Sequence, residues 1–489
     1  MSASDLSSPS ISIQEINKVA KPPAVSMAGM SSCVIVGHSI DAVTTATVLA
    51  SLEQTVYLYV DESALQHTLA TYTFEHQLQA LWQLYISQTQ IVLCPVPSSA
   101  SELFSQLKTN PDSEFKPKPL VRSLEADLGS ISADLSNKTA LFWLFYSELP
   151  SSWTQKTGGT DDWIIQFNKA SKTPAPLILS GIDVLGKFAS IARECNYPWV
   201  YYVPFVFLQD GKAYASMLSP KLWLMGEKTP KSTHKIAILQ PLLSQAQQTF
   251  ITDIATTEFA RSAIMNMLAT RVSFMNEWSR LADHQQIDIT EVAMIMGLDE
   301  RIGKSYLKAG WGFGGQTLPA EINALQQTLS EARVENRLMH AVDQINDDQK
   351  ELIFRKFWQY FDGCIEGKTV SIWGGSYKEG SGRTSASAIH PLLNLLWSYD
   401  ITTQVYAGEA QGELLSLYSE QPLLQFIAQP ETGLSQSQAL FILTWTPYQQ
   451  VPISTINDGA LPVFDAQNAL TNSQIDMLIG DYIGIGRGK

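Results

Sequence analysis

The sequence predicts an α/β protein in which two sheet-containing domains are joined by a long central helix. Three observations support this prediction. The chain has 489 residues, 45% of them hydrophobic, so it is too long for one ordinary domain and can bury a sizeable core. Short apolar, β-branched and aromatic runs recur in its first half and return near its end. Between them, residues 242–296 contain neither glycine nor proline and carry apolar residues at helical spacing.

The predicted strands of the first half do not alternate between apolar and polar residues, so we expect them to be buried on both faces of a parallel sheet. These strands are 32–37, 56–61, 90–96, 140–147, 176–181 and 199–205. The helical stretch DAVTTATVLASLEQ lies between the first two, which makes residues 32–61 one strand–helix–strand unit. The polar, proline-containing region 97–139 is expected to be an irregular excursion.

The middle of the chain predicts one long helix over residues 253–284, ending before Gly297. One apolar stripe of this helix comprises Ile264, Leu268, Val272 and Met275, and a second comprises Met267, Phe274, Trp278 and Leu281. A helix with two apolar faces must be covered on both, which is typical of a spine between domains or across a subunit interface. An ordinary core helix within one chain is the alternative, and the pattern does not choose between them.

A further helical stretch is expected at 318–357, after which strands return. These strands are 369–375, 402–408, 439–446, 462–468 and 482–486. The pattern divides the chain into four parts. They are a disordered serine-rich tail (1–30), an N-terminal α/β domain (31–235), a central helical domain (236–357) and a C-terminal α/β domain (358–489).

Composition argues against several classes of partner. The net charge of −14 is unlike that of a protein that holds nucleic acid or anionic lipid by broad electrostatics. The cysteines, which are Cys33, Cys94, Cys195 and Cys364, are scattered without a CxxC pair, so neither structural disulfides nor a metal site is expected. The serine-rich start is unlike a signal peptide, and the apolar run 140–146 is too short to span a membrane. We therefore expect a cytoplasmic protein without a membrane, nucleic-acid or metal partner.

The segment VIVGHSIDA, residues 34–42, lies where the dinucleotide-binding turn of a Rossmann-like domain lies, after the first strand and at the start of a helix. Gly37, Ser39 and Ala42 fill the three positions that require small residues. Ser39 adds a hydroxyl where a pyrophosphate needs room, whereas Asp61 stands where a carboxylate accepts ribose hydroxyls and favours NAD over NADP. We expect NAD binding to be weak or absent, and a strand–helix–strand unit with no ligand is the alternative.

The segment WGFGGQTLPAEINAL, residues 311–325, contains a glycine-rich loop that leads directly into an amphipathic helix. Gly312, Gly314 and Gly315 permit positive φ angles and a close approach to a ligand. A loop at a helix start is a common position for a nucleophile or a bound anion. The turn, however, ends in a glutamine and Thr317, and neither is a ready nucleophile.

Four segments of the chain, taken together, match one known pattern. They are LATRVSFMNE (268–277), GLDERIGKSYLKAGWGFGG (297–315), GGSYKEGSGRTSAS (374–387) and DYIGIGRG (481–488). With them the chain resembles the UDP-glucose/GDP-mannose dehydrogenase family from about residue 31 onward. The resemblance implies two Rossmann-like domains joined by a long central helix and a helical dimerisation region. It also implies oxidation of the C6 alcohol of a nucleotide sugar to a carboxylate, with two NAD and a cysteine thiolate that carries the intermediate.

The resemblance places different residues at the family's catalytic positions. Thr317 stands where the nucleophilic cysteine is expected, and a threonine hydroxyl is scarcely ionised at neutral pH. Arg261 replaces a lysine that stabilises the developing oxyanion, and Met265 replaces an asparagine. Glu321 replaces an aspartate that helps to activate water. The other replaced positions are Val206, Ala320, Ser385 and Gln467.

Other positions of the family's sites are retained. The resemblance assigns Arg301 to the sugar site of a partner subunit. It assigns Tyr306 and Lys308 to the nucleotide-sugar loop, and it assigns Tyr377 and Lys378 to a C-terminal nucleotide site. Cationic side chains beside backbone amides suit a pyrophosphate. The alternative is that these residues pack the loop and the dimer. The retained residues of the loop itself are Gly312, Phe313, Gly314 and Gly315.

Three interpretations follow from this pattern. The first is a non-catalytic relative that binds a nucleotide or a UDP- or GDP-linked sugar as a homodimer, or that regulates an active homologue. The second is a divergent NAD-dependent dehydrogenase in which Arg261 and Glu321 have been recruited. The third is a structural protein with empty pockets. The joint replacement of the thiol, the amide and several charged groups favours the first.

Overall fold

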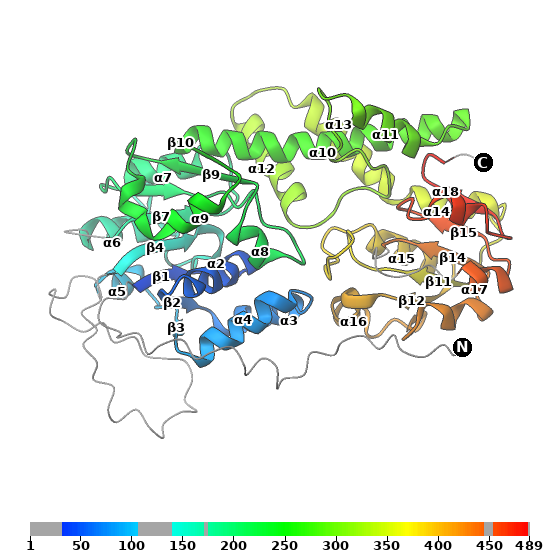
Figure 1. Cartoon of the computed structure of the whole chain (residues 1–489), viewed down its shortest axis with the longest axis horizontal. Helices are drawn as coiled ribbons and strands as arrows, with labels where there is room; N and C mark the ends of the chain where they lie inside the picture. The colour runs from blue at the N-terminus through cyan, green and yellow to red at the C-terminus, as the bar shows by residue number, and fades with distance from the viewer. Residues whose placement is uncertain (1–31, 106–138, 171–174, 445–452, 488–489) are drawn as a thin grey trace, which may run out of the picture.

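The computed structural model of the chain describes residues 32–105, 139–170, 175–444 and 453–487. Two α/β domains lie end to end, and a long helix runs along the same side of both (Figure 1). The predicted tail at 1–30 and most of the predicted excursion at 97–139 lie outside the described residues. The described part of that excursion includes a short helix, α5, Ala100–Ser105.

Within the described residues, the N-terminal sheet has eight strands in the order β10-β9-β8-β7-β4-β1-β2-β3, and only the β8–β9 pair is antiparallel. The strands are β1 Ser32–Val36, β2 Thr55–Val60, β3 Ile91–Pro95, β4 Thr139–Phe145, β7 Leu177–Ser180, β8 Val200–Tyr202, β9 Leu222–Glu227 and β10 Gln248–Asp253. Alternate residues of β1 enter separate cores, with Cys33 and Ile35 on one face and Val34 and Val36 on the other. Both faces are buried, which confirms the prediction drawn from the continuous apolar runs.

Helices cover both faces of this sheet. They are α2 Ile40–Ser51, α3 Glu62–Thr71, α4 His76–Ser87, α6 Asp162–Ala170, α7 Lys187–Glu194, α8 Ala213–Leu218 and α9 Gln240–Gln245. Val43 of α2 packs in the core on one face, whereas Phe188 of α7 packs in the core on the other. The smaller elements are the hairpin of β5 Lys156–Thr157 and β6 Thr160–Asp161 and the 3-10 turns η2 Tyr146–Glu148 and η3 Thr233–Leu239.

Strands β9 and β10 were not predicted from the sequence. β10 lies within the glycine- and proline-free stretch, whose composition favoured helix throughout. Its residues Thr249, Phe250 and Ile251 are nonetheless β-branched or aromatic, and they pair in parallel register with β9. The absence of helix breakers therefore does not exclude a strand. The N-terminal sheet ends at Asp253 and not near residue 235, the predicted end of the domain.

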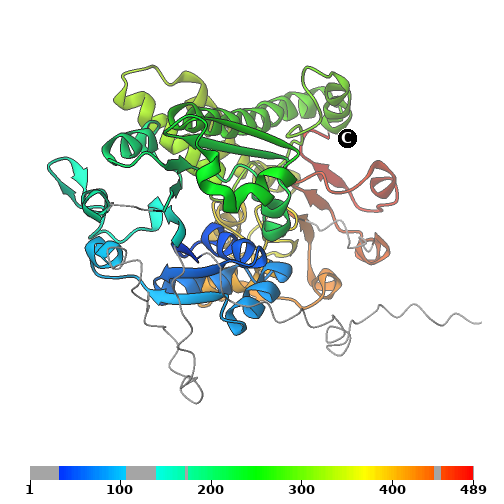
Figure 2. The same cartoon turned by 60° about the vertical axis from the view of Figure 1, so that its left-hand side comes forward.

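The long helix α10 spans Ile254–Gln285 and confirms the predicted helix over 253–284. Asp253 caps it, because its carboxylate accepts hydrogen bonds from the Thr256 amide at 2.9 Å and the Thr256 hydroxyl at 2.6 Å. Gln286 ends the helix in the left-handed conformation, with a φ of 56°. Figures 1 and 2 show α10 lying along one side of both α/β layers.

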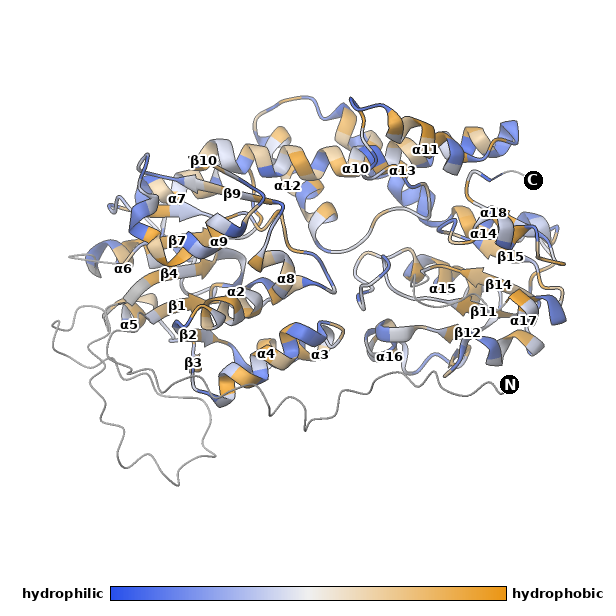
Figure 3. Cartoon of the chain, viewed as in Figure 1, coloured by the Kyte–Doolittle hydropathy of each residue, from blue (hydrophilic) through white to orange (hydrophobic). Residues whose placement is uncertain are grey.

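The second apolar stripe of α10 is exposed in the single chain. Its residues Met267, Phe274, Trp278 and Leu281 have exposed fractions between 42% and 60%. Figure 3 shows hydrophobic residues along α10 and the following helix at the upper edge of the molecule. An ordinary core helix would bury both stripes within its own chain, so that alternative is wrong for the isolated chain. Of the first stripe, Met275 is fully buried.

The predicted helical stretch 318–357 is confirmed as a succession of helices. These helices are α12 Thr317–Glu331, α13 Arg337–Lys350 and α14 Leu352–Tyr360. The helical region also contains α11, Ile289–Leu298, which precedes them. Ser273 of α10 donates to the Val342 carbonyl of α13 at 2.9 Å, which ties the two helices together. Phe357 of α14 packs in the core of the C-terminal domain. α14 therefore packs against that domain, while its Lys356 pairs with Asp283 of α10 at 2.6 Å and links it to the helical region.

Within the described residues, the C-terminal sheet has six parallel strands in the order β13-β12-β11-β14-β15-β16. The strands are β11 Thr369–Trp373, β12 Thr402–Tyr406, β13 Leu424–Phe426, β14 Ala439–Ile442, β15 Val463–Asp465 and β16 Tyr482–Gly484. All of them except β13 were predicted. The helices are α15 Ile389–Ser398, α16 Gln411–Tyr418, α17 Ile453–Asp458 and α18 Asn472–Ile475, with 3-10 turns η4 Gly408–Ala410 and η5 Pro430–Gln436.

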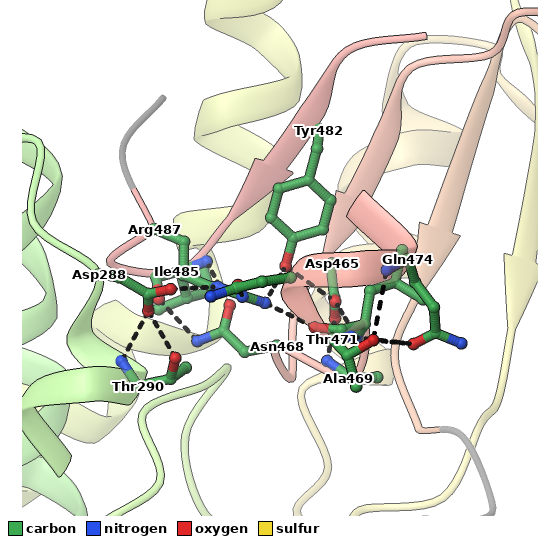
Figure 4. Close-up of polar contacts among 12 residues, drawn as sticks. Asp288, Thr290, Asp465, Asn468, Ala469, Thr471, Gln474, Tyr482, Ile485 and Arg487 are labelled. Atoms are coloured by element: carbon green, nitrogen blue, oxygen red, sulfur yellow. Dashed lines mark hydrogen bonds and ion pairs between the residues drawn. The ribbon is translucent and has the colours of Figure 1, made fainter. Parts of the chain in front are cut away.

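The closing segment of the chain joins the C-terminal sheet to α11. Arg487 is buried, and Figure 4 shows its guanidinium directed toward Asp288, the N-cap of α11, and toward Tyr482. Its Nε lies 3.2 Å from Asp288 Oδ2, and its Nη1 donates to the Leu470 carbonyl at 2.7 Å. A Cβ on Gly486, whose φ is +67°, would lie 2.7 Å from the Ser279 Cβ of α10. This part of the family resemblance therefore has a structural explanation.

Candidate functional site

The glycine-rich loop between α11 and α12 is held by buried amide side chains. Asn276 of α10 accepts a hydrogen bond from the Gly310 amide at 2.9 Å, and Gln349 of α13 donates to the Gly310 carbonyl at 2.7 Å. Asn346 accepts from the Phe313 amide at 2.7 Å and donates to its carbonyl at 3.2 Å. These groups were not recognised in the sequence, where they read as polar positions of two helices. The scaffold fixes the loop without a ligand.

The glycines of this loop are required by close packing. Gly312 has a φ of +94°, and a Cβ on it would lie 2.7 Å from Asn346 Oδ1. Gly315 has a φ of +82°, and a Cβ there would lie 2.8 Å from the Tyr377 ring of the C-terminal domain. A Cβ on Gly314 would lie 2.9 Å from a backbone oxygen of the same domain. The structure therefore gives a packing reason for the glycines, whether or not the loop also binds a ligand.

Arg261 of α10 and Glu321 of α12 form a buried ion pair. The Arg261 Nε donates to Glu321 Oε1, and its Nη1 donates to the Pro204 carbonyl at 2.5 Å. The two residues are only 6% and 3% exposed. Burial alone would lower the pKa of Arg261, but Tyr202 and Glu321 hold it above its usual value. The two charged side chains that the sequence assigns to catalytic positions thus pair with each other.

The space beside this ion pair is small. A cavity of about 10 Å³ adjoins Arg261 and Glu321 and is lined also by Tyr202 and Glu258. Such a volume holds about one water molecule. Thr317 is the first residue of α12, one helical turn before Glu321, and it is exposed.

The other residues predicted at replaced catalytic positions make local contacts. Met265 is buried one turn after Arg261 on α10, and its thioether has no hydrogen to donate. Val206 packs against the N-terminal core. The Ser385 hydroxyl accepts from the Arg383 guanidinium at 2.8 Å, and the Gln467 amide oxygen lies 3.0 Å from the position of a Cβ on Gly310.

The cysteines of the chain lie away from Thr317. Cys33, Cys94 and Cys195 are buried in the N-terminal domain, and Cys364 lies exposed in the connection between α14 and β11. Burial raises the pKa of Cys94 and of Cys195 to about 12, and it raises the pKa of Cys33 further. These buried thiols are protonated at neutral pH and are poor nucleophiles.

Arg301 and Tyr306 lie on the surface of the single chain. The Arg301 side chain is 88% exposed and pairs only with its neighbour Asp299, at 2.6 Å, among the ion pairs of the described residues. Tyr306 is exposed and has a φ of +59°. Both therefore lie where a second molecule could contact them.

Tyr377 connects the two α/β domains, and Lys378 packs beside its ring. The Tyr377 hydroxyl donates to Asp210 Oδ2 of the N-terminal domain at 2.6 Å, and the Lys378 ammonium lies 5.4 Å from the Tyr377 ring centre. Burial and the Asp210 carboxylate raise the pKa of Tyr377, so its hydroxyl remains a donor. Lys308 forms an exposed ion pair with Glu379 at 3.3 Å.

Arg383 was not recognised as a site residue in the sequence. Its guanidinium lies 4.7 Å from the ring centre of Tyr72 in the N-terminal domain, and its Nε lies 3.3 Å from Glu413 Oε2 of its own domain. A Cβ on Gly211 would lie 2.5 Å from the Gly380 carbonyl oxygen. The loop between β11 and α15 is therefore packed directly against the N-terminal domain.

The first turn of the N-terminal domain is tightly packed. A Cβ on Gly37 would lie 3.0 Å from the Ala42 Cβ. Ser39 caps α2, with its hydroxyl accepting from the Ala42 amide at 3.4 Å. Asp61 caps α3 in the same way, accepting from the Ala64 amide at 2.9 Å. This hydrogen bond, with that from the Ser63 hydroxyl, lowers the pKa of Asp61. Both capping residues therefore have structural roles.

A carboxylate of the chain lies at the start of α2. Glu148 ends η2, directly after β4, and its Oε2 accepts from the His38 amide at 2.5 Å and the Ser39 amide at 2.7 Å. These amides belong to the turn that would face a dinucleotide pyrophosphate. With the Glu148 carboxylate on these amides, the turn has no place for the pyrophosphate of a dinucleotide. The sequence signal was an acidic residue after a predicted strand, which is too common to single out.

Membrane-spanning helices and metal-ligand clusters can be assessed over residues 32–105, 139–170, 175–444 and 453–487. None of the helices there carries a stretch long and apolar enough to cross a bilayer. In the same ranges, no three or more histidine, cysteine, aspartate or glutamate side chains are grouped so that they could hold a metal ion.

Comparison with known proteins matches the chain to the UDP-glucose/GDP-mannose dehydrogenase family, central domain, over residues 255–348. A UDP-glucose 6-dehydrogenase of Pseudomonas aeruginosa is 27% identical over 290 residues, which cover 58% of this chain and 64% of the relative. A putative UDP-glucose 6-dehydrogenase of Bacillus subtilis is 30% identical over 286 residues, with coverages of 58% and 65%. The chain thus spans just under two thirds of the length of these curated relatives.

Solved structures share the fold. A UDP-glucose dehydrogenase from Pyrobaculum islandicum superposes with a TM-score of 0.68 at 17% identity, covering 95% of this chain and 99% of that one. A UDP-D-ManNAc dehydrogenase from Pyrococcus horikoshii gives 0.67 at 15% identity, with coverages of 94% and 99%. These structures share with this chain the arrangement of two α/β domains and a long helix. Residues 255–348 thus match the central domain of the UDP-glucose/GDP-mannose dehydrogenase family, and the chain is similar to UDP-glucose 6-dehydrogenases over the aligned part.

Proposed function

We propose that this chain is a non-catalytic member of its family that binds a nucleotide or a UDP- or GDP-linked sugar. The observation that carries the proposal is the buried ion pair between Arg261 and Glu321, which lies one helical turn from Thr317. In the family's reaction a thiolate holds the aldehyde as a thiohemiacetal while the second hydride leaves. Here the corresponding hydroxyl is not ionised, and the nearby cation is already paired with a carboxylate.

Loss of the oxyanion donors supports the same proposal. Met265 cannot donate a hydrogen bond, and the Arg261 guanidinium is committed to Glu321 and the Pro204 carbonyl. Removal of a single donor of this kind typically costs about 10²–10³ in rate. With the thiol replaced as well, the chain's own residues supply neither the covalent step nor its electrostatic stabilisation.

Nucleotide-sugar binding is supported by the cations near the glycine-rich loop. Lys308 lies four residues before Gly312 and pairs with Glu379 at 3.3 Å. The Lys378 ammonium lies 5.4 Å from the ring centre of Tyr377, the ring against which Gly315 packs. The exposed pair between Lys308 and Glu379 is worth little by itself, so a phosphate can replace the carboxylate at small cost. A diphosphate linked to uridine or guanosine has the charge that these lysines would complement.

A homodimer is part of the proposal. The exposed stripe of α10, which includes Phe274 and Trp278, continues onto α11 with Met294, Ile295 and Leu298, all more than 60% exposed on α11. A contiguous apolar surface of this kind on one side of the molecule is typical of a subunit interface. Arg301 follows α11 and would then lie close to the second subunit.

Titration calorimetry with UDP-glucose and GDP-mannose tests the binding. We expect micromolar affinity for one of them and a loss of about tenfold or more, which is about 1.4 kcal/mol, in Lys378→Ala. Lys221→Ala, which removes an exposed lysine of the N-terminal domain, serves as the matched control and should bind as the wild type does. Absence of binding to either sugar nucleotide at millimolar concentration would leave a structural role, and the proposal would be abandoned.

A further inference from the structure

Glu148 occupies a position with the geometry of an anion site. It follows the buried strand β4, and its side chain is only 11% exposed. Its Oε2 lies between the amides of His38 and Ser39, which open the 12-residue helix α2. The same oxygen would lie 2.9 Å from a Cβ on Gly37, so the carboxylate fills the space that the glycine leaves.

These amides are the groups that hold phosphate in a dinucleotide-binding fold. The N-terminus of a helix carries partial positive charge and free N–H groups, and it therefore attracts an anion. In the Rossmann arrangement the pyrophosphate lies at the N-terminus of the helix after the first strand. Here α2 is that helix, and the anion is supplied by the chain.

Acidic groups around Glu148 further disfavour the binding of an anion at the start of α2. Asp41 lies in the first turn of α2, and burial and then the Glu148 carboxylate raise its pKa to about 7. Asp210 contributes in the same sense, and Arg261 acts against it. A pyrophosphate would enter a space that already disfavours a second negative charge.

Carboxylates also accept hydrogen bonds from helix amides elsewhere in this domain. Glu148 differs from them because it lies at the first turn, where a dinucleotide would bind. Glu258 accepts from the Phe188 and Ala189 amides of α7, each at 2.9 Å. That carboxylate is a buried cap on a different helix. It provides an internal comparison in which the same chemistry occurs away from the first turn.

We propose that Glu148 is an internal substitute for the pyrophosphate of a dinucleotide and that it excludes NAD and nucleoside diphosphates from the N-terminal domain. Its carboxylate satisfies the amides of His38 and Ser39, and it repels anions that would compete for them. Glu148 is thus a specificity-determining residue. The inference is independent of nucleotide-sugar binding at the glycine-rich loop, and its test uses different ligands.

The test compares binding of NAD, ADP and adenosine to the full chain by calorimetry. Glu148→Ala empties the position, and we expect it to bind NAD and ADP at least tenfold more tightly than the wild type. Adenosine, which has no phosphate, should show no change. Glu258→Ala removes the comparable carboxylate from α7 and should gain no affinity for NAD. Glu148→Gln keeps the space filled without the charge, so its gain should be smaller than that of Glu148→Ala.

The outcomes separate clearly. A folded Glu148→Ala with no gain for NAD or ADP overturns the proposal, and so does an equal gain in Glu258→Ala. If Glu148→Ala does not fold, Glu148→Ser is measured in its place. Hydrogen exchange of the wild type gives a reading that needs no variant: 10 mM NAD should leave the exchange of residues 37–45 unchanged. Protection of that segment by NAD would show that the carboxylate is displaced and the proposal wrong.

Discussion

At the scale of single residues, the Arg261–Glu321 pair is the feature on which most of the site's behaviour depends. Each charge is removed from water and is paired with the other, and the Arg261 guanidinium also donates to the Pro204 carbonyl. Removal of one partner from such a pair leaves an unpaired buried charge, which costs far more than the pair itself contributes. The ion pair therefore affects the stability of the fold as well as the chemistry of the site.

We expect Glu321→Ala to lower the free energy of unfolding by about 3–5 kcal/mol, because the Arg261 guanidinium then lacks its counter-charge. The double variant Arg261→Met with Glu321→Leu should lose much less, because no charge remains. Urea unfolding followed by tryptophan fluorescence measures both. A loss below about 0.5 kcal/mol in Glu321→Ala would contradict the buried pairing.

Asp41 gives a prediction about pH. Burial and then Glu148 raise the pKa of Asp41 to about 7, above its ordinary value of 3.8. Between those values the folded chain keeps a proton that the unfolded chain has lost, so this group makes stability fall as the pH rises from about 4 to 7.

Asp41→Asn should therefore be more stable than the wild type at pH 8, by about 1–4 kcal/mol, and similar to it at pH 4. Thermal unfolding across this pH range measures the difference. Asp458→Asn, an exposed substitution of the same kind at the end of α17, serves as the control. A Asp41→Asn variant with no pH-dependent gain would show that Asp41 is ionised in the folded chain.

From the sequence, the site could be described only as a set of single substitutions, and their assignment stays a prediction. Arg261, Met265, Glu321 and Thr317 could each be seen as a replacement. That Arg261 and Glu321 pair with each other depends on α10 and α12 packing together, and they are 60 positions apart. Glu148 was missed for a similar reason, since it lies 110 positions from His38 and only the sheet brings them together.

At the scale of elements, α10 carries the exposed apolar surface of the proposed dimer interface. Its exposed stripe includes Trp278, which contacts Phe274 with ring centres 5.6 Å apart. We expect Trp278→Asp to dissociate the proposed dimer, because a charge in a covered apolar face is costly. Analytical ultracentrifugation at micromolar concentration measures this.

Trp358→Asp is the matched control, since Trp358 is also exposed but lies on α14. It should leave the association unchanged. If the wild type sediments as a monomer, the dimer is wrong. If Trp358→Asp dissociates the protein equally, the interface has been assigned to the wrong helix.

The elements themselves were largely predictable. Strands buried on both faces are recognisable as short apolar runs, and the caps of α10 at Asp253 and Gln286 lie within two residues of the predicted ends. β10 was missed because the lack of glycine and proline is shared by helices and strands. β13 has only three residues, Leu424–Phe426, and too little pattern to detect.

At the scale of the whole molecule, the two α/β domains are held together by contacts among their own side chains. Asp210 accepts from Tyr377, and Arg383 packs on Tyr72 across the same boundary. The glycine-rich loop packs against the same segment of the C-terminal domain through Gly315. The groups that would have to admit a nucleotide sugar are therefore also the groups that fix the arrangement of the domains.

This arrangement leads to the last prediction, which concerns turnover. The purified protein should form no NADH, measured by absorbance at 340 nm, from UDP-glucose or GDP-mannose with NAD. Thr317→Cys should not restore activity by itself, because the Arg261 guanidinium would still be paired with Glu321 and Met265 would still supply no donor. A combined variant, Thr317→Cys with Arg261→Lys, Met265→Asn and Glu148→Ala, should show the first measurable rate, since it restores the nucleophile, the oxyanion donors and the space at α2 together. Wild-type turnover near one per second, the rate of an ordinary enzyme, would instead establish a divergent dehydrogenase.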